Sequence, residues 1–152
     1  MINENLKLSG QLNIVLKDKD GNVKDSREVK NLVVNAGLAY IASRMVGTAK
    51  SVMSHMALGS GTTAAAAAQT DLVSILGSRE ALDSTTITGT NSEKVQYVSS
   101  FEAGDATGAV TEAGIFNAST AGDMLCRTVF SVVNKAADDT MTVTWTITLS
   151  AT

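Results

Sequence analysis

The most constraining feature of this sequence is a strict two-residue alternation near its C-terminal end. In "MTVTWTITL", residues 141–149, each large apolar residue is followed by a threonine. Successive side chains of a β-strand point to opposite faces, and threonine suits strands, so this pattern predicts a strand with one buried and one wet face. We expect Trp145 to lie on the buried face, in the core.

The same period recurs along the chain. In "NLKLSGQLNIVLK", residues 5–17, leucine and isoleucine stand mostly at every second position, and "VKDSREVKNLVV" returns after a turn that contains glycine. From Ser78 onward, several further runs are rich in valine and threonine. About eight strands joined by short turns are typical of a sandwich or jelly roll. We therefore predict a mainly β, jelly-roll-like sandwich that forms a single domain over residues 1–152.

Two segments depart from the β pattern. In "NAGLAYIASRMVG" the period becomes helical, and we expect one short α-helix near residues 36–46, capped by Asn35 and ended by Gly47. Its apolar residues would face the sheets: Leu38, Ile41, Ala42 and Met45. The alanines of "TTAAAAAQTDLVSIL" favour helix, but the Gly-Ser-Gly before them favours a loop. We expect mostly loop there, with at most a helical turn over residues 70–73.

The sequence does not satisfy most of the known catalytic and metal-binding motifs. One cysteine and one histidine can form neither an internal disulfide nor a protein-only zinc site. "GSGTTA", residues 59–64, with Glu80 beyond it, fits a degenerate dinucleotide fingerprint, but that fingerprint needs a strand-helix-strand unit that the downstream sequence does not predict. We interpret it as a coincidence. We expect His55, between methionines, to be a packed or hydrogen-bonded core residue.

The stretch "VTEAGIFNASTAGDMLCRTVF", residues 110–130, gathers the remaining chemically interesting side chains. Alternation predicts that Cys126 points into the core and that Arg127 faces outward as a surface contact. Glu112 and Asp123 could pair with Arg127 or bind a cation, and we favour structural pairing because calcium loops are richer in acidic residues. We therefore predict a hairpin without catalytic groups, and a chain that is not an enzyme and holds no metal.

Charge is unevenly distributed along the chain. Residues 1–50 carry eight lysines and arginines against five acids, whereas residues 51–152 carry four against ten. The basic part could face an acidic protein surface. It lacks the dense basic patch with interleaved aromatics of a nucleic-acid binder. We also expect no secretory signal and no membrane span, since no apolar run approaches the ~20 residues that a bilayer requires.

Four pieces of the sequence, taken in order, carry a family resemblance. They are "NLVVNAGLAYIASRM", "MSHMALGSGTTAAAAAQTDL", "VTEAGIFNASTAGDMLCRTVF" and "DTMTVTWTITLS". This arrangement resembles a group of small virion structural proteins of tailed bacteriophages. Similar runs occur in head decoration (cement) proteins and in the N-terminal attachment domains of tail-collar fibre proteins. The resemblance covers residues 31–149.

The resemblance implies a non-enzymatic virion protein without a cofactor, made in the host cytoplasm. It suggests a decoration protein that binds the outer capsid shell and stabilises the head. The expected partners are the major capsid protein and the chain itself, as a homotrimer at a local three-fold axis, with no nucleic acid, membrane or small-molecule substrate. The expected contacts with these partners are Lys17, Lys19, Lys24, Arg27, Gly59, Ser60, Gly61, Thr62, Thr63 and Arg127. For the lysines, a solvated edge that discourages aggregation is the alternative.

Two other functions stay open. The sequence ends at Thr152, directly after the last predicted strand and without a coiled coil or fibre repeat, so we favour the head over a tail, collar or baseplate position. A carbohydrate-binding adhesin module is the more remote alternative. It is disfavoured because aromatics make up only 4% of the residues and Trp145 is expected in the core, which leaves little for sugar stacking.

Overall fold

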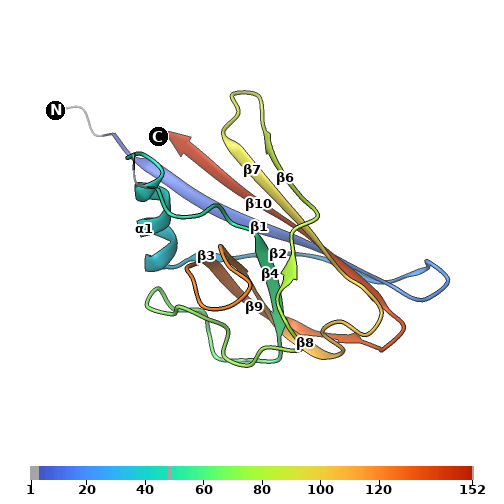
Figure 1. Cartoon of the computed structure of the whole chain (residues 1–152). Coiled ribbons are helices and arrows are strands. Elements are labelled where there is room, and N and C mark those ends of the chain that lie inside the picture. The colour runs from blue at the N-terminus through green and yellow to red at the C-terminus, as the bar shows by residue number, and fades with distance from the viewer. Residues whose placement is uncertain (1–3, 48, 152) are drawn as a thin grey trace.

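The computed structural model describes residues 4–47 and 49–151. Two antiparallel five-stranded sheets pack against each other (Figure 1). Sheet A has the order β2-β1-β10-β7-β6, with the strands β1 (Leu6–Lys17), β2 (Val23–Lys30), β6 (Ser84–Thr88), β7 (Lys94–Phe101) and β10 (Thr140–Ala151). Sheet B has the order β3-β9-β8-β4-β5, with β3 (Leu32–Val33), β4 (His55–Gly59), β5 (Glu80–Ala81), β8 (Gly108–Phe116) and β9 (Met124–Lys135).

The prediction of a mainly β sandwich with one short helix is confirmed. The described residues form ten strands rather than about eight. The two short strands β3 and β5 span only two residues each, which is too short to leave a periodic pattern in the sequence. Residue 31 alone separates β2 from β3, so the chain passes directly from one sheet to the other.

The first and last long strands lie side by side in the middle of sheet A. β1 and β10 pair in register over twelve positions, with Leu12 opposite Trp145 and Ile14 opposite Val143. Along β10, fully or nearly buried apolar residues alternate with half-buried threonines through Ile147, as the sequence predicts. The alternation on β1 holds from Leu12 onward, but Leu6 is 74% exposed because it lies at the outer end of the strand.

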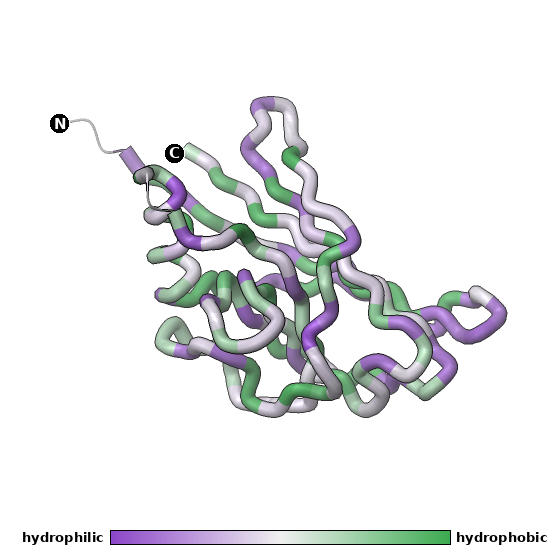
Figure 2. Tube along the Cα trace, in the orientation of Figure 1, coloured by the Kyte–Doolittle hydropathy of each residue, from purple (hydrophilic) through white to green (hydrophobic). Residues whose placement is uncertain are grey.

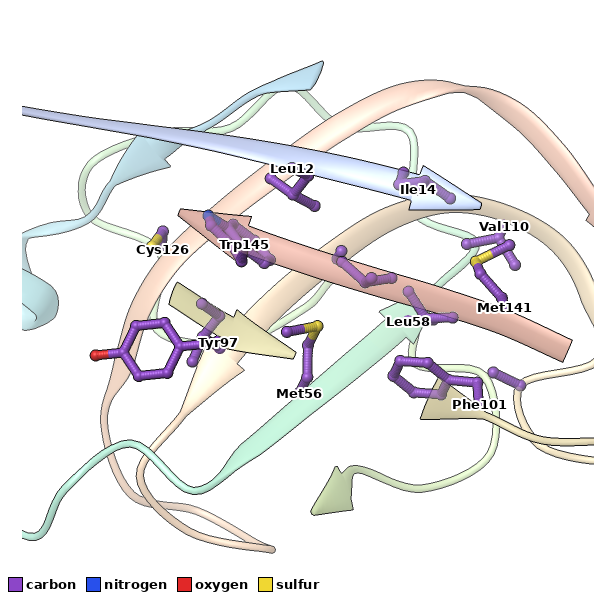
Figure 3. Close-up of a cluster of buried hydrophobic side chains, with 14 of the residues drawn as sticks. Leu12, Ile14, Met56, Leu58, Tyr97, Phe101, Val110, Cys126, Met141 and Trp145 are labelled. Carbon is purple, nitrogen blue, oxygen red and sulfur yellow. The ribbon is translucent and has the colours of Figure 1, made fainter. Parts of the chain in front are cut away.

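The core lies between the sheets and draws on strands of both (Figure 3). Trp145 is fully buried, and its indole Nε1 donates a hydrogen bond to Asn31 Oδ1 at 2.9 Å. Cys126 is also fully buried, and this burial raises the pKa of its thiol well above the ordinary value. The predictions for Trp145 and Cys126 are therefore confirmed. Other fully buried core side chains are Leu12, Met56, Leu58, Phe101, Val110, Ile115, Met141 and Val143.

A glycine on β1 makes room for the partner of Trp145. A Cβ on Gly10 would overlap the side-chain amide of Asn31. Asn31 can therefore lie where a larger residue at position 10 would stand, and its Oδ1 can accept the indole proton. The break in the leucine pattern between Leu8 and Leu12 thus serves the buried hydrogen bond.

The helix α1 (Asn35–Ser43) ends earlier and packs through a different face than predicted. Val34 occupies the N-cap position without a side-chain cap, so Asn35 is the first helical residue rather than the cap. Gly37 and Tyr40 are buried against the sandwich, and a Cβ on Gly37 would overlap the backbone of Leu125. The close approach needs a glycine, which hydropathy alone does not identify. Of the four residues predicted to face the sheets, only Ile41 is partly buried, and the other three are exposed: Leu38, Ala42 and Met45. Gly47 lies beyond the end of the helix.

Candidate functional site

The outer face of sheet B is covered by the long segment 60–79, which we call the cover loop (Figure 1). It contains no helical turn over residues 70–73. A turn lies at residues 67–68, Ile75 forms an isolated β-bridge with Gly59, and the rest is loop, as the sequence mostly predicts. Leu72 packs on Ala57, Phe116 and Met124. This second apolar cluster lies on the opposite side of sheet B from the main core.

A buried ion pair holds the cover loop to the sheet. Glu112 on β8 and Arg127 on β9 are both 0% exposed, and Arg127 donates to Glu112 Oε2 from Nε at 2.9 Å and from Nη2 at 2.6 Å. The carboxylate also accepts backbone N–H bonds from Gly61 at 3.0 Å, Val73 at 3.1 Å and Ser74 at 2.7 Å. Five hydrogen bonds thus meet on one carboxylate, three of them from the cover loop.

The guanidinium of Arg127 is satisfied on its remaining side by the same loop. Its Nη1 donates to Thr63 O at 3.0 Å and to Gln69 Oε1 at 2.9 Å. A buried ion pair is tolerable when its remaining donors and acceptors find partners, and here both groups find them in the cover loop. The contacts to Thr63 and Gln69 therefore hold the two ends of the alanine run 64–68 to the sheet.

The surroundings of Glu112 favour its charged form. Burial raises the pKa of this carboxyl, but the hydrogen bonds from Ser74, Arg127 and Val73 and the charge of Arg127 lower it further than burial raises it. The pKa lies below the ordinary value of 4.5. A carboxylate held ionised and enclosed by five donors is suited to fixing the fold, not to exchanging protons with a substrate.

A second arginine fastens the far end of the cover loop. Arg79 lies 3.5 Å from the centroid of the Phe116 ring and donates to the carbonyls of Ala118 at 2.9 Å and Ala121 at 2.7 Å. It also contacts Asp71 at 3.3 Å, so the loop is tied to itself and to the turn between β8 and β9. The sequence pattern does not identify Arg79, because its partners are backbone carbonyls far away in the chain.

The structure corrects one predicted contact and refines others. Arg127 is not an outward-facing surface residue, since the cover loop buries it completely; the predicted pairing of Glu112 with Arg127 is confirmed. Asp123 instead pairs with Lys50 at 3.0 Å and bonds Asn117 across the turn. In the predicted contact loop, Gly59 and Gly61 are buried, Ser60 is half-buried, and Thr62 and Thr63 are exposed.

The predicted basic hairpin is only partly available to a partner. Lys17 and Lys19 are exposed, whereas Lys24 forms an ion pair with Asp139 at 2.6 Å. Arg27 pairs with Asp25 and donates to Ser131 O at 2.6 Å. Figure 2 shows the tip of this hairpin as a hydrophilic projection beyond the sandwich. His55 is half-buried, and its Nδ1 is hydrogen-bonded to Ser54 Oγ at 2.8 Å, as expected of a hydrogen-bonded histidine.

The open outer face of sheet A carries a basic concavity that sequence reasoning missed. The register places Lys30 beside Gln11, Gln11 beside Thr146, and Lys94 beside Thr148. Together with Lys7 these residues line a hollow of about 550 Å³, completed by Ser9 and Gly10. Within residues 4–47 and 49–151, none of the three ammonium groups takes part in an ion pair. We call Lys7, Lys30 and Lys94 the lysine triad.

This concavity joins residues that lie far apart in the sequence. Alternation places Lys7, Ser9 and Gln11 on one face of β1, but only the order β2-β1-β10-β7 brings Lys30 and Lys94 to them. Three cations that form no ion pair with the described residues, above a surface of hydroxyl and amide groups, can attract carboxylates or other anions and donate hydrogen bonds to them. The described residues contain no cluster of three or more histidine, cysteine or acidic side chains that could hold a metal ion.

Comparisons of the chain with protein-family models, with curated proteins and with solved structures give no match. Among the described residues, no helix is both long enough and apolar enough to cross a membrane.

Proposed function

We propose that this chain is a non-enzymatic structural protein of a tailed-bacteriophage virion, which binds the outer capsid surface as a decoration (cement) protein. The proposal rests first on the resemblance of residues 31–149 to such proteins. Two of the four pieces that carry this resemblance, 53–72 and 110–130, meet at the pair of Glu112 and Arg127. Their polar groups therefore have a structural use, which agrees with a scaffold role.

The lysine triad is the observation that best supports attachment to a shell. Its three cations come from three strands of one sheet and line a hollow on the outer face of that sheet, where Lys7 and Lys30 are exposed and Lys94 is half-buried. Such a surface is complementary to an acidic patch on another protein, and electrostatic complementarity fixes the orientation of binding and speeds encounter. Lys17 and Lys19, exposed at the hairpin tip, could add to the same contact.

Attachment of this kind gains strength from repetition. A contact of about 800 Å² per partner is typical of stable protein complexes, and several such contacts made together raise the overall avidity. We propose that copies of the chain assemble as trimers on the shell, at its local three-fold axes, and there engage several subunits of the major capsid protein at once. Shell stabilisation would follow because dissociation of a subunit would then break contacts with the decoration layer as well.

Cosedimentation with shells of the major capsid protein encoded alongside this chain tests the proposal. We expect saturable binding that weakens as salt rises, because exposed ion pairs are screened. Replacing the lysine triad by alanine should reduce binding, while a Lys17→Ala/Lys19→Ala variant measures the contribution of the hairpin tip. Failure of the wild-type chain to sediment with shells, at low as at high salt, would contradict a capsid role.

A further inference from the structure

The free edge of sheet A at β2 carries an ordered pattern of charge. β2 is the outermost strand of its sheet, next to β1 alone. Residues 23–29 read Val-Lys-Asp-Ser-Arg-Glu-Val. Three pairs of residues stand at equal distances on the two sides of Ser26. They are Asp25 and Arg27, Lys24 and Glu28, and Val23 and Val29. The segment is therefore a palindrome in which each charge is matched by its opposite.

This pattern is complementary to itself in one arrangement. Two copies related by a two-fold axis through Ser26 would bring their β2 strands together antiparallel, and an interface of this symmetry is self-complementary by construction. Asp25 would then lie opposite Arg27 of the second copy, and Lys24 opposite Glu28 of the second copy. Oppositely charged residues directly across an antiparallel pair stabilise it, and like charges destabilise it.

The neighbouring registers are unfavourable. A slip of two residues in one direction places Arg27 opposite Arg27 of the second copy, and Lys24 opposite Lys30 of the second copy. A slip in the other direction places Asp25 opposite Asp25 of the second copy. Registers that keep the same faces inward differ by two residues, so the charges select the register centred on Ser26 over both of its neighbours.

Of the four charged side chains, those of Asp25 and Arg27 already lie where such a pairing needs them, whereas Glu28 accepts a hydrogen bond from Gln11 of its own chain. Asp25 and Arg27 share one face, their ion pair measures 2.5 Å, and Arg27 is steadied by Ser131 O on β9. In the dimer these two residues from each copy would form an alternating ring of four charges. The register with β1 shifts at Lys24, where Lys24 bonds Asp139, so the contact rests on the regular part of β2 from Asp25 onward.

We infer that β2 is a self-association strand: a second copy of this chain pairs its β2 antiparallel to the first around Ser26, joining two five-stranded sheets into one of ten strands. The inference goes beyond the proposed capsid role and does not depend on it. The other edge strand of sheet A, β6, carries no charged residue, so it has no charge pattern that could select a pairing register. A contact built on one short strand is small, so we expect a weak, exchanging dimer.

Sedimentation velocity over a concentration series of up to about 1 mM tests the inference, because contacts well below ~1,000 Å² are weak. We expect the wild-type chain to show a concentration-dependent monomer–dimer exchange. Asp25→Lys and Arg27→Glu each create two like-charge pairs in the homodimer, so each variant alone should dimerise about tenfold or more weakly. An equimolar mixture of the two variants restores opposite charges and should dimerise within about threefold of wild type.

The mixture also separates charge pairing from folding damage, because mixing cannot repair a misfolded chain. Lys19→Glu makes a comparable charge change in the exposed turn outside the paired segment and should leave dimerisation within about threefold of wild type. A wild-type chain that stays monomeric throughout would overturn the inference and leave the charges of β2 as a device that blocks strand addition. Self-association that the two variants do not weaken, or that their mixture does not restore, would overturn it as well.

Discussion

On the outer face of sheet B, Arg127 is fully buried and bonded to Glu112, whereas on the outer face of sheet A the ammonium groups of Lys7 and Lys30 face solvent. Both faces place cations on antiparallel strands. The difference is the cover loop, which closes one face and leaves the other open. A cation on the closed face stabilises the fold through its internal contacts, whereas a cation on the open face is available to a partner. Substitutions on the two faces should therefore change the free energy of unfolding by very different amounts.

The largest effect is expected where the closed face loses its cation. Arg127→Ala leaves the carboxylate of Glu112 buried without its charged partner, and breaking a buried pair in this way costs about 3–5 kcal/mol of the free energy of unfolding. Arg44→Ala, which removes an exposed arginine with one backbone bond, should cost about 1 kcal/mol or less. Urea denaturation of the two variants checks the contrast, and equal losses would contradict the role of Arg127 in holding the cover loop to sheet B.

Crowding the contact between sheet B and the cover loop should have the next largest effect. A Cβ on Gly61 would overlap Glu112 Oε1 and lie 2.8 Å from Val73 Cβ, so Gly61→Ala should cost about 1–3 kcal/mol. Among the described residues, no atom lies within 4 Å of the corresponding position at Gly47, so Gly47→Ala should change the free energy of unfolding by no more than about 0.5 kcal/mol. Thermal unfolding of both variants is the measurement, and an unperturbed Gly61→Ala would show that the loop is loosely held.

The buried carboxylate also predicts a pH dependence. Since the pKa of Glu112 is lower in the folded state than its ordinary value of 4.5, the charged form stabilises the fold above that value. This stabilisation is lost as the pH falls through the lowered pKa. The difference in free energy of unfolding between wild type and Glu112→Gln should therefore shrink as the pH drops from 7 toward 3. A difference that stays constant over this range would contradict the assignment of a lowered pKa.

The smallest effect on stability is expected on the open face. Removing each member of the lysine triad by alanine should change the free energy of unfolding by about 0.5 kcal/mol or less, as for ordinary surface substitutions. The same substitutions are those expected to reduce binding to capsid shells. Calorimetric unfolding of the triple variant checks this. A large loss of stability would show that the open face, too, belongs to the fold.

Local alternation in the sequence predicts what depends on a single strand. It places Trp145 and Cys126 in the core and identifies β10 with its threonines, because each of these depends only on the two-residue period. It also brings Glu112 and Arg127 within reach of each other, since they lie in consecutive strands of one hairpin. The alternation wrongly predicts that Arg127 is exposed, because a loop from elsewhere in the chain covers the face of the sheet toward which Arg127 points.

Features that depend on the pairing of distant strands are not visible in the sequence. The lysine triad needs the sheet order, and the buried face of α1 depends on a close contact of Gly37 with Leu125 rather than on a stripe of large apolar residues. The charge pattern of β2, on which the inferred dimer rests, is visible in the local sequence. It can select a pairing register only because β2 is an edge strand. The order of the strands in the sheets is therefore the information that adds most to what the sequence alone predicts.

The central claim, that the open face attaches this chain to a capsid shell, is tested most directly by its copy number in purified virions. Quantitative mass spectrometry would measure the ratio of this chain to the major capsid protein. The account predicts a ratio near one, or a simple fraction set by the shell lattice. A handful of copies per virion would contradict it and point to a tail, collar or baseplate component instead.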